Sequence, residues 1–252
     1  MKKLLELIAR HKSGQAVGLY SVCSAHPLVL EAALRLAQRG SSYALIEATS
    51  NQVNQDGGYT GMRPADFVQF VRAIATRVGF PHERVLLGGD HLGPNCWQQL
   101  SAEQALRHSE RLVEDYVAAG FRKIHLDCSM GCADDPSPLP EAVIASRAAR
   151  LCAASERAWQ QVGGSDAPVY VIGTEVPTPG GATEDLQTLE VTRPEAVAAT
   201  ISSESGTGSP AQAMEQSRWI LRKPAATYCS TRRSERASAC SESSCCQQLG
   251  PK

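Results

Sequence analysis

An acidic and an imidazole side chain stand side by side in the stretch Gly88–Pro94, directly after the apolar run Val85–Leu87. This run predicts a buried strand, and the surrounding glycines and proline end it and let the backbone approach a ligand closely. Asp90 is suited to general acid or base chemistry, and His91, as a neutral imidazole, is suited to binding a metal ion such as zinc. The alternative is a hydrogen-bonded pair that only fixes a loop, and the local sequence alone favours that alternative.

Three more apolar runs end at a carboxylate in the same way, namely those that reach Glu47, Asp127 and Glu175. Together with Asp90, these carboxylates are spaced 43, 37 and 48 residues apart, which fits repeated strand–helix units with loop insertions. Carboxylates at the C-terminal ends of neighbouring parallel strands converge on one mouth. We therefore expect Asp90, Asp127 and Glu175 to be candidate catalytic residues at this mouth, with Glu47 beside the substrate.

The segments that position these residues alternate between strand and helix patterns. After an amphipathic helix at the start of the chain, apolar runs predict five strands, over residues 16–23, 43–48, 85–89, 123–128 and 169–176. Proline, glycine and capping signals predict a helix after each strand, over about 24–39, 64–78, 101–119, 140–162 and 194–201. In the third of these helices, Ser101 and Gln104 match a capping box.

Repeated strand–helix alternation implies parallel strands joined by right-handed crossovers. The predicted fold is therefore α/β, of the (β/α)8 TIM-barrel type, and incomplete, because about five units are visible where a barrel needs eight. A doubly wound open sheet is the alternative. It is disfavoured because no GxGxxG-like turn follows the first strand.

The composition changes after residue 201. Residues 202–252 contain eleven serines and four cysteines, and their longest apolar run is Trp219–Leu221. Low apolar content of this kind predicts disorder. We expect a partial barrel domain over residues 1–201 and a low-complexity tail over 202–252, and we interpret the tail as the product of a frameshift or truncation.

Size and charge narrow the possible partners. The chain has 252 residues, 42% hydrophobic and 20% charged, with a net charge of −1. No basic surplus is available to meet phosphates, which argues against nucleic acid as the main partner. No apolar run approaches the roughly 20 residues that span a bilayer, and no signal-peptide pattern opens the chain. We therefore expect a cytoplasmic protein with neither a nucleic-acid nor a membrane partner.

Loops beyond the strand ends are the candidates for holding a substrate. Asn51 and Gln52 either bind sugar hydroxyls or satisfy the backbone of their own loop. Gly180 and Gly181 either cradle a phosphate with backbone N–H groups or form a tight turn that needs a positive φ. These four residues and Glu47 are the predicted substrate-binding set, with a sugar phosphate as the candidate ligand.

Two residues of the fourth predicted strand are given no direct role. His125 alternates with apolar neighbours, so we expect it between sheet and helices or in the barrel interior, away from the substrate. An imine mechanism needs a lysine at the exit of a strand. Lys123 stands at the entrance of its strand, which argues against that mechanism.

Five motifs together resemble the non-catalytic (Z-type) subunits of D-tagatose-1,6-bisphosphate aldolase: Tyr20–Pro27, Ile46–Val53, Gly88–Pro94, Ile124–Met130 and Ile172–Pro177. The resemblance covers about residues 1–201, and chains of that family are considerably longer. It implies a cytoplasmic role in D-tagatose 6-phosphate degradation, within galactitol or N-acetylgalactosamine catabolism. It also implies a catalytic (Y-type) subunit as partner, whose activity and stability the Z-type subunit supports in a chaperone-like way.

The same strand ends resemble, more distantly, the zinc-dependent class II aldolases. That resemblance implies a proton-transferring role for Asp90, zinc ligation by His91, and matching strand-end positions for Asp127 and Glu175. Two further zinc histidines would come from later strands, yet no histidine follows His125. The leading hypothesis is therefore an accessory subunit of an aldolase (lyase) complex, with zinc as its one candidate cofactor. A zinc-dependent ketose-bisphosphate aldolase and an inactive truncated fragment are the alternatives.

Overall fold

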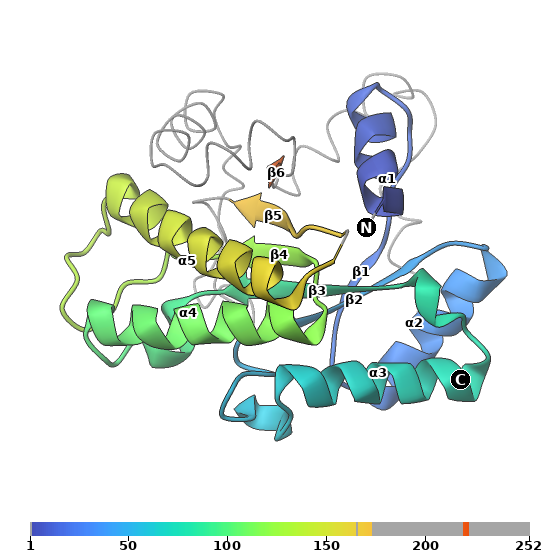
Figure 1. Ribbon diagram of the computed structural model, residues 1–252, viewed down its shortest axis with the longest axis horizontal. Helices are drawn as coiled ribbons and strands as arrows, with labels where there is room; N and C mark the ends of the chain where they lie inside the picture. The colour runs from blue at the N-terminus through green and yellow to red at the C-terminus, as the bar shows by residue number, and fades with distance from the viewer. Residues whose placement is uncertain (1, 165, 173–218, 222–252) are drawn as a thin grey trace, which may run out of the picture.

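A single sheet of parallel strands organises the protein. The computed structural model describes residues 2–164, 166–172 and 219–221 (Figure 1). The sheet has six parallel strands in the order β1-β2-β3-β4-β5-β6. Their bounds are Ser21–Cys23, Ala44–Thr49, Val85–Leu92, Lys123–Leu126, Val169–Ile172 and Trp219–Leu221. The order follows the chain without the reversal that defines a doubly wound sheet. The protein thus has a partial TIM-barrel-like α/β fold, as predicted.

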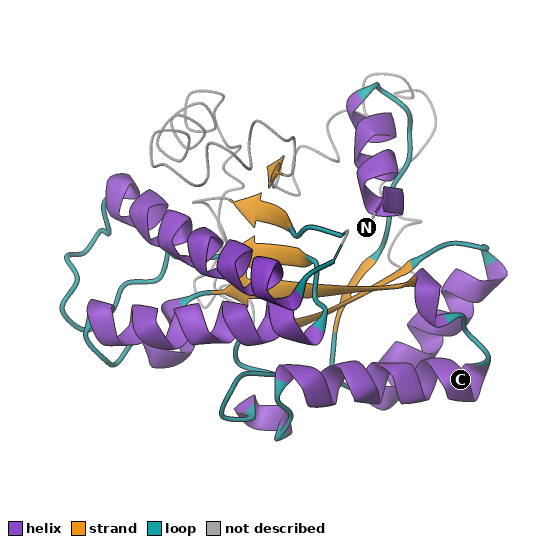
Figure 2. Cartoon of the chain, viewed as in Figure 1, coloured by secondary structure: helices purple, strands orange, loops and turns teal. Residues whose placement is uncertain are grey.

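Helices connect the strands from β1 to β5 in turn, and one further helix precedes β1 (Figure 2). They are α1 (Lys2–Lys12), α2 (Pro27–Arg39), α3 (Pro64–Val78), α4 (Ala102–Ala119) and α5 (Glu141–Val162), with 3-10 turns at Gly58–Thr60, His82–Arg84 and Pro94–Trp97. Helices α2 to α5 pack beside one another along one face of the sheet, whereas α1 lies on the other side (Figure 1). Among the described helices, none is long and apolar enough to cross a membrane.

The period-2 alternation of the strands divides their side chains between the two faces. The face toward α2–α5 carries the main apolar core, to which Ile46, Ile124 and Tyr170 contribute fully buried side chains. The opposite face changes character along the strands. Near the strand entrances Leu45 and Leu86 pack against Leu4 of α1, so the start of α1 covers an apolar layer.

Charged groups follow further along the same face. The next level, in register across β2, β3 and β4, consists of Glu47, Gly88 and Lys123. Beyond it, Thr49 is the register partner of Asp90, at the C-terminal ends of the strands. The interior of a TIM barrel is usually filled by bulky aliphatic side chains. Core packing alone therefore does not account for this polar layer.

Several elements differ from the sequence prediction. Strand β1 contains only Ser21–Cys23, since this edge strand pairs with β2 at just three positions. The expected capping box at the start of α4 does not form: the Ser101 hydroxyl donates to the Gln104 side chain, and Asp134 Oδ1 instead accepts the Ala102 N–H at 2.6 Å. Trp219–Leu221, within the segment expected to be disordered, adds β6 to the sheet beside β5.

Candidate functional site

A β-bulge in β3 creates the local geometry of the site. The register shifts between Gly89 and Leu92, where three steps along β3 match two steps along β4. Asp90 and His91 therefore both lie opposite His125. His91 has a φ of 50°, a left-handed conformation that costs a non-glycine residue about 1–3 kcal/mol. The bulge breaks the normal alternation, so that two consecutive side chains reach the neighbouring strand.

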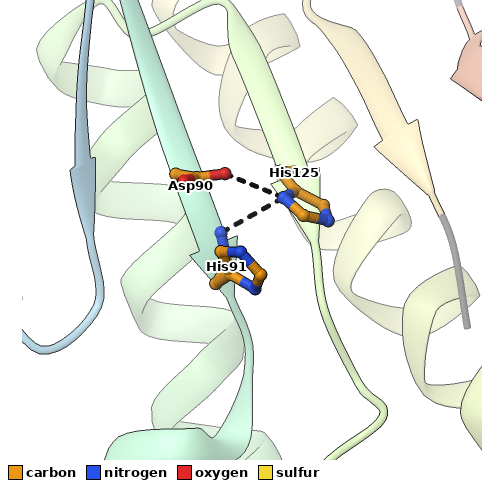
Figure 3. A group of neighbouring side chains, drawn as sticks. All are labelled: Asp90, His91 and His125. Carbon is orange, nitrogen blue, oxygen red and sulfur yellow. Dashed lines mark hydrogen bonds and ion pairs between the residues drawn. The ribbon is translucent and has the colours of Figure 1, made fainter. Parts of the chain in front are cut away.

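Two carboxylate–histidine pairs cross between the strands. Asp90 Oδ1 lies 2.9 Å from His125 Nδ1, and His91 Nδ1 lies 2.7 Å from Asp127 Oδ2. The two imidazole rings are neighbours, with centroids 4.6 Å apart (Figure 3). The second oxygen of Asp127 accepts hydrogen bonds from the Ser129 hydroxyl at 2.6 Å and backbone N–H at 3.1 Å. Each pair thus joins a residue of β3 to one in β4 or directly after it, since β4 ends at Leu126.

Burial and pairing set the charge of these groups. Burial raises the pKa of Asp90, but the hydrogen bond from His125 and the charges of Lys123 and His91 outweigh it and hold that pKa well below its ordinary value. Burial likewise raises the pKa of Asp127, and hydrogen bonds led by that from His91 again bring it below the ordinary value. Burial lowers the pKa of His125, which its bond to Asp90 only partly opposes. The site therefore holds two carboxylates and a neutral His125 at neutral pH.

Ionised carboxylates also decide where the imidazole protons sit. A carboxylate can only accept a hydrogen bond, so Nδ1 of both His91 and His125 must carry the proton. The backbone N–H of His91 also lies 3.4 Å from His125 Nδ1 (Figure 3). A protonated Nδ1 of His125 cannot donate to Asp90 and accept from this N–H at the same time. The contact with Asp90 is shorter and charge-assisted, so we assign it as the hydrogen bond.

Lys123 extends the cluster toward β2. Its Nζ lies 2.5 Å from Glu47 Oε1 and 3.8 Å from Asp90 Oδ1, and the Ser21 hydroxyl donates to the other Glu47 oxygen. The lysine crosses β3 at Gly88, where a Cβ atom would lie 2.5 Å from Glu47 Oε1 and 3.1 Å from Lys123 Cδ. A glycine at this position therefore makes room for the ion pair. Both partners are nearly excluded from solvent, with side-chain exposures of 12% and 3%.

Three residues of the cluster have the donor types of a metal site. Ligand atoms of Asp90, His91 and His125 all lie within 4.8 Å of one another. Imidazole and carboxylate donors suit zinc and related divalent ions. His125 Nε2 is buried and has no hydrogen-bond partner in the described part of the chain. These residues therefore fit a divalent metal ion.

The side chains of the predicted substrate-binding loop make hydrogen bonds within the loop and to neighbouring elements. Gln52 Oε1 accepts the Thr49 N–H at 2.8 Å. Asn51 uses its backbone oxygen for the Tyr59 N–H at 2.9 Å, and its side-chain oxygen lies 3.0 Å from Cys96 Sγ. Gln52 is 8% exposed. The Gln52 oxygen also accepts from Cys23 Sγ of β1 at 3.5 Å, so both side chains link the loop to neighbouring elements.

The predicted site residues thus separate into three groups. Asp90, His91 and Asp127 come together at the ends of β3 and β4, and Glu47 joins them through Lys123. Asn51 and Gln52 lie in the loop after β2, where their side chains contact Cys96 and Cys23. Glu175, Gly180 and Gly181 lie outside the described residues.

The interpretation of the sequence missed two members of the cluster. Lys123 was set aside because it stands at the entrance of β4, yet its long side chain carries the ammonium to the level of Glu47 and Asp90. His125 is expected between the sheet and the helices or in the barrel interior; it lies on the interior face, where it bonds to Asp90. The signal for both was the spacing Lys123, His125, Asp127, since every second residue of a strand shares one face.

Comparison with known proteins agrees with the sequence motifs. A family model described as D-tagatose-1,6-bisphosphate aldolase subunit GatZ/KbaZ-like matches residues 4–212. The chain belongs to this family. The match extends past residue 201, where the sequence motifs had suggested that the resemblance ends.

A solved structure of similar sequence supports the GatZ/KbaZ-like assignment and the fold. It is described as a probable tagatose 6 phosphate kinase from Sinorhizobium meliloti 1021, and it shares 50% sequence identity with a TM-score of 0.69. The alignment covers 81% of this chain and 48% of that protein. The GatZ/KbaZ-like chain described here therefore matches about half the length of its solved relative.

Proposed function

We propose that this protein is an accessory, non-catalytic subunit of D-tagatose-1,6-bisphosphate aldolase. In this role it binds a separate catalytic (Y-type) subunit in the cytoplasm and prolongs its activity in a chaperone-like way. The pathway we propose is D-tagatose 6-phosphate degradation, in galactitol or N-acetylgalactosamine catabolism. We also propose that residues 1–201 form the partial barrel unit that carries this role, with residues 202–252 as a tail that adds β6 to the sheet. Membership of the GatZ/KbaZ-like family supports the proposal.

The observation that best supports the non-catalytic role is the hydrogen bonding and ionisation of Asp90. Aldol cleavage needs a base that takes a proton from the substrate, and that base must reach the substrate hydroxyl. The Asp90 oxygen Oδ1 is bonded to His125 and lies beside the Lys123 ammonium. These contacts stabilise the ionised form, so the carboxylate is a weaker base than a free aspartate.

A zinc-dependent aldolase activity of the chain itself is the second candidate. The grouping of Asp90, His91 and His125 favours it, because these residues fit a divalent ion. Such an ion would polarise the carbonyl of a ketose bisphosphate as a Lewis acid. The described residues bring two histidines to this point, whereas catalytic zinc sites usually have three protein ligands. Phosphoryl transfer is not proposed, since the sequence contains no GxxxxGK[ST] loop.

Activity of the isolated chain separates the two candidates. The purified protein, supplied with zinc, is incubated with D-tagatose 1,6-bisphosphate, and the triose phosphates are measured by coupled oxidation or reduction of a nicotinamide cofactor. The accessory role predicts no cleavage above the zinc-only blank. Cleavage that disappears in Asp90→Asn would overturn the accessory role in favour of the second candidate.

A matched variant guards this assay against a contaminating aldolase. Gln69→Glu changes an exposed residue of α3, outside the predicted site, and the protein is purified in the same way as Asp90→Asn. Cleavage that persists equally in both variants would come from a contaminant, and the accessory role would stand. Turnover in the wild type and Gln69→Glu, but not in Asp90→Asn, would assign the activity to this chain.

A further inference from the structure

We propose that one face of α2 is the surface on which the catalytic subunit docks, through an apolar segment edged with acidic side chains. This docking face consists of Leu28, Val29, Ala32 and Leu36, with Arg35 and Arg39 at its edge. The proposal rests on the accessory role proposed above and deepens it, because it names the surface through which the two subunits make contact. Its test is arranged so that the docking face can fail while the accessory role stands.

Helix α2 stands at an edge of the fold. It follows β1, which is an edge strand and pairs only with β2 among the described strands. Its buried side chains, Leu30, Leu34 and Ala37, face the core. Helix α3 packs along one flank, where Arg77 forms an ion pair with Glu31 at 2.9 Å. The layer of helices α2–α5 begins at α2 (Figure 1), so its opposite flank is open among the described helices.

The docking face is apolar although it is exposed. Leu28 is 69% exposed, Val29 45% and Leu36 59%. They are three of the seven exposed large apolar residues in the described part of the chain. Leu28, Ala32 and Leu36 follow one another at intervals of four, so they form one stripe along the helix. A surface helix normally presents polar residues opposite its core face, and apolar residues gathered on one exposed face mark an interaction site.

Basic side chains edge the docking face. Arg35 and Arg39 are exposed and lie on the same side of α2 as the apolar stripe. Glu31, the one acidic residue of α2, already forms ion pairs with Arg35 and Arg77, each at 2.9 Å. This face therefore has an excess of positive charge, although the net charge of the whole chain is −1. A partner with acidic side chains around an apolar centre would be complementary to it.

The same charges disfavour a second copy of this chain as the occupant. In an antiparallel pair of α2 helices that brings Val29 of one copy against Leu36 of the other, Arg39 would lie against the N-terminus of the opposite helix. A helix N-terminus already carries partial positive charge, so this contact is repulsive.

The size of the docking face sets the expected affinity. The 13 residues of α2 span about 20 Å, so this helix supplies only part of the roughly 800 Å² that each partner buries in an interface of standard size. We therefore expect a weak and reversible complex, with a Kd on the order of micromolar.

Docking is measured by titrating the fluorescently labelled full chain with a purified catalytic (Y-type) subunit, and by following the half-life of aldolase activity in the same mixtures. Leu28→Gln/Leu36→Gln removes the two most exposed apolar side chains of the docking face. Glutamine and leucine have similar helix propensities, so α2 should stay folded. The Kd should rise at least about tenfold, and the gain in half-life should be lost at concentrations near the wild-type Kd. An unchanged Kd would overturn the docking face.

Leu5→Gln/Val162→Gln is the matched control. It removes two exposed apolar side chains from α1 and α5, outside the docking face. Its Kd and its gain in half-life should equal those of the wild type. A Kd raised equally in both double variants would mean that loss of apolar surface anywhere weakens binding, and would contradict a specific role for α2.

The basic edge is tested by Arg35→Gln/Arg39→Gln. Removing these charges should slow association about three- to tenfold at low salt, and should make the association rate less dependent on ionic strength. Arg107→Gln/Arg111→Gln is the matched control, since it removes two exposed arginines with the same spacing from α4. An association rate that falls equally in both variants would reflect net charge alone and would contradict the assigned role of the edge.

Two measurements on the chain alone identify the other occupants. A dimer in sedimentation velocity that Leu28→Gln/Leu36→Gln abolishes would make the face a contact between two copies of this chain. A Tm of that variant several degrees below that of Leu5→Gln/Val162→Gln would mean that the face packs against another part of the same chain. Either result would overturn the docking proposal.

Failure of the docking face and failure of the accessory role give different results. If the wild-type chain binds the catalytic subunit and prolongs its activity, and Leu28→Gln/Leu36→Gln does so equally, only the docking face is wrong. If the wild-type chain neither binds the catalytic subunit nor prolongs its activity, the accessory role is contradicted and the docking face with it.

Discussion

Replacing Gly93 by alanine places a methyl group against the backbone that follows β4. The residue has an extended backbone, with φ of 175° and ψ of −162°, so alanine is not excluded by conformation. The added Cβ, however, would lie 1.8 Å from the carbonyl oxygen of Asp127 and 2.8 Å from its carbonyl carbon. Both are backbone atoms, so no side-chain rotation relieves the contact.

The size of the effect follows from the distance that must open. An ordinary C···O contact is about 3.3 Å, so the segments after β3 and β4 must separate by roughly 1.5 Å. Forced repacking of this kind costs about 3 kcal/mol, which corresponds to a fall in Tm of about 6–12 °C for a domain of this size. The same separation pulls Asp127 away from His91, whose bond to it is 2.7 Å long.

Gly131→Ala is the matched control. A Cβ at Gly131 would meet only Asp135 Cβ, at 3.8 Å, and its backbone is not left-handed. Its Tm should stay within about 1 °C of the wild type, in line with surface substitutions that cost under about 0.5 kcal/mol. Tm values are measured for the three proteins by circular dichroism under identical conditions. Equal Tm values for Gly93→Ala and Gly131→Ala would refute the close approach of the two segments.

Two further predictions concern pH and a buried hydroxyl. The pKa values of His125 and Asp90 are lowered on folding, so the unfolded chain binds protons first and stability falls with decreasing pH. With a chelator present, the urea concentration at the unfolding midpoint should decrease as the pH is lowered through about 6.5, where free histidine titrates, and decrease again below about pH 4. A midpoint that stays constant from pH 7.5 to 4 would contradict this. The Tyr116 hydroxyl donates to the buried Val53 carbonyl at 2.9 Å, so Tyr116→Phe should cost about 1 kcal/mol. Its Tm should fall by about 2–4 °C, whereas Tyr59→Phe, at a residue 73% exposed, should leave Tm unchanged; equal effects would count against the buried bond.

The fold was predictable because its signals are local. Alternating apolar runs and helix boundaries at proline and glycine mark each strand–helix unit, and parallel strands bring their C-terminal ends together. That reasoning alone places Asp90 and Asp127 at one mouth. It could not assign β6, because three apolar residues in Trp219–Leu221 are too few to distinguish a strand from an isolated cluster.

The details of the site depend on features that the sequence does not display. The bulge at Asp90–His91 changes the side of the strand on which the His91 side chain is expected from simple alternation. This bulge is visible only in the register of β3 against β4. The reach of Lys123 depends on the missing side chain at Gly88, a residue on another strand. The contacts of Asn51 with Cys96 and of Gln52 with Cys23 depend on how their loop folds back, which loop composition does not specify.

The most direct test of the accessory role follows the activity of a catalytic tagatose-bisphosphate aldolase subunit over time, with and without this chain. The account predicts a longer half-life of activity with the chain, saturating at a fixed molar ratio, and no cleavage by the chain alone. An equal concentration of serum albumin controls for nonspecific protection. An unchanged half-life, with the chain soluble and folded throughout, would contradict the accessory role.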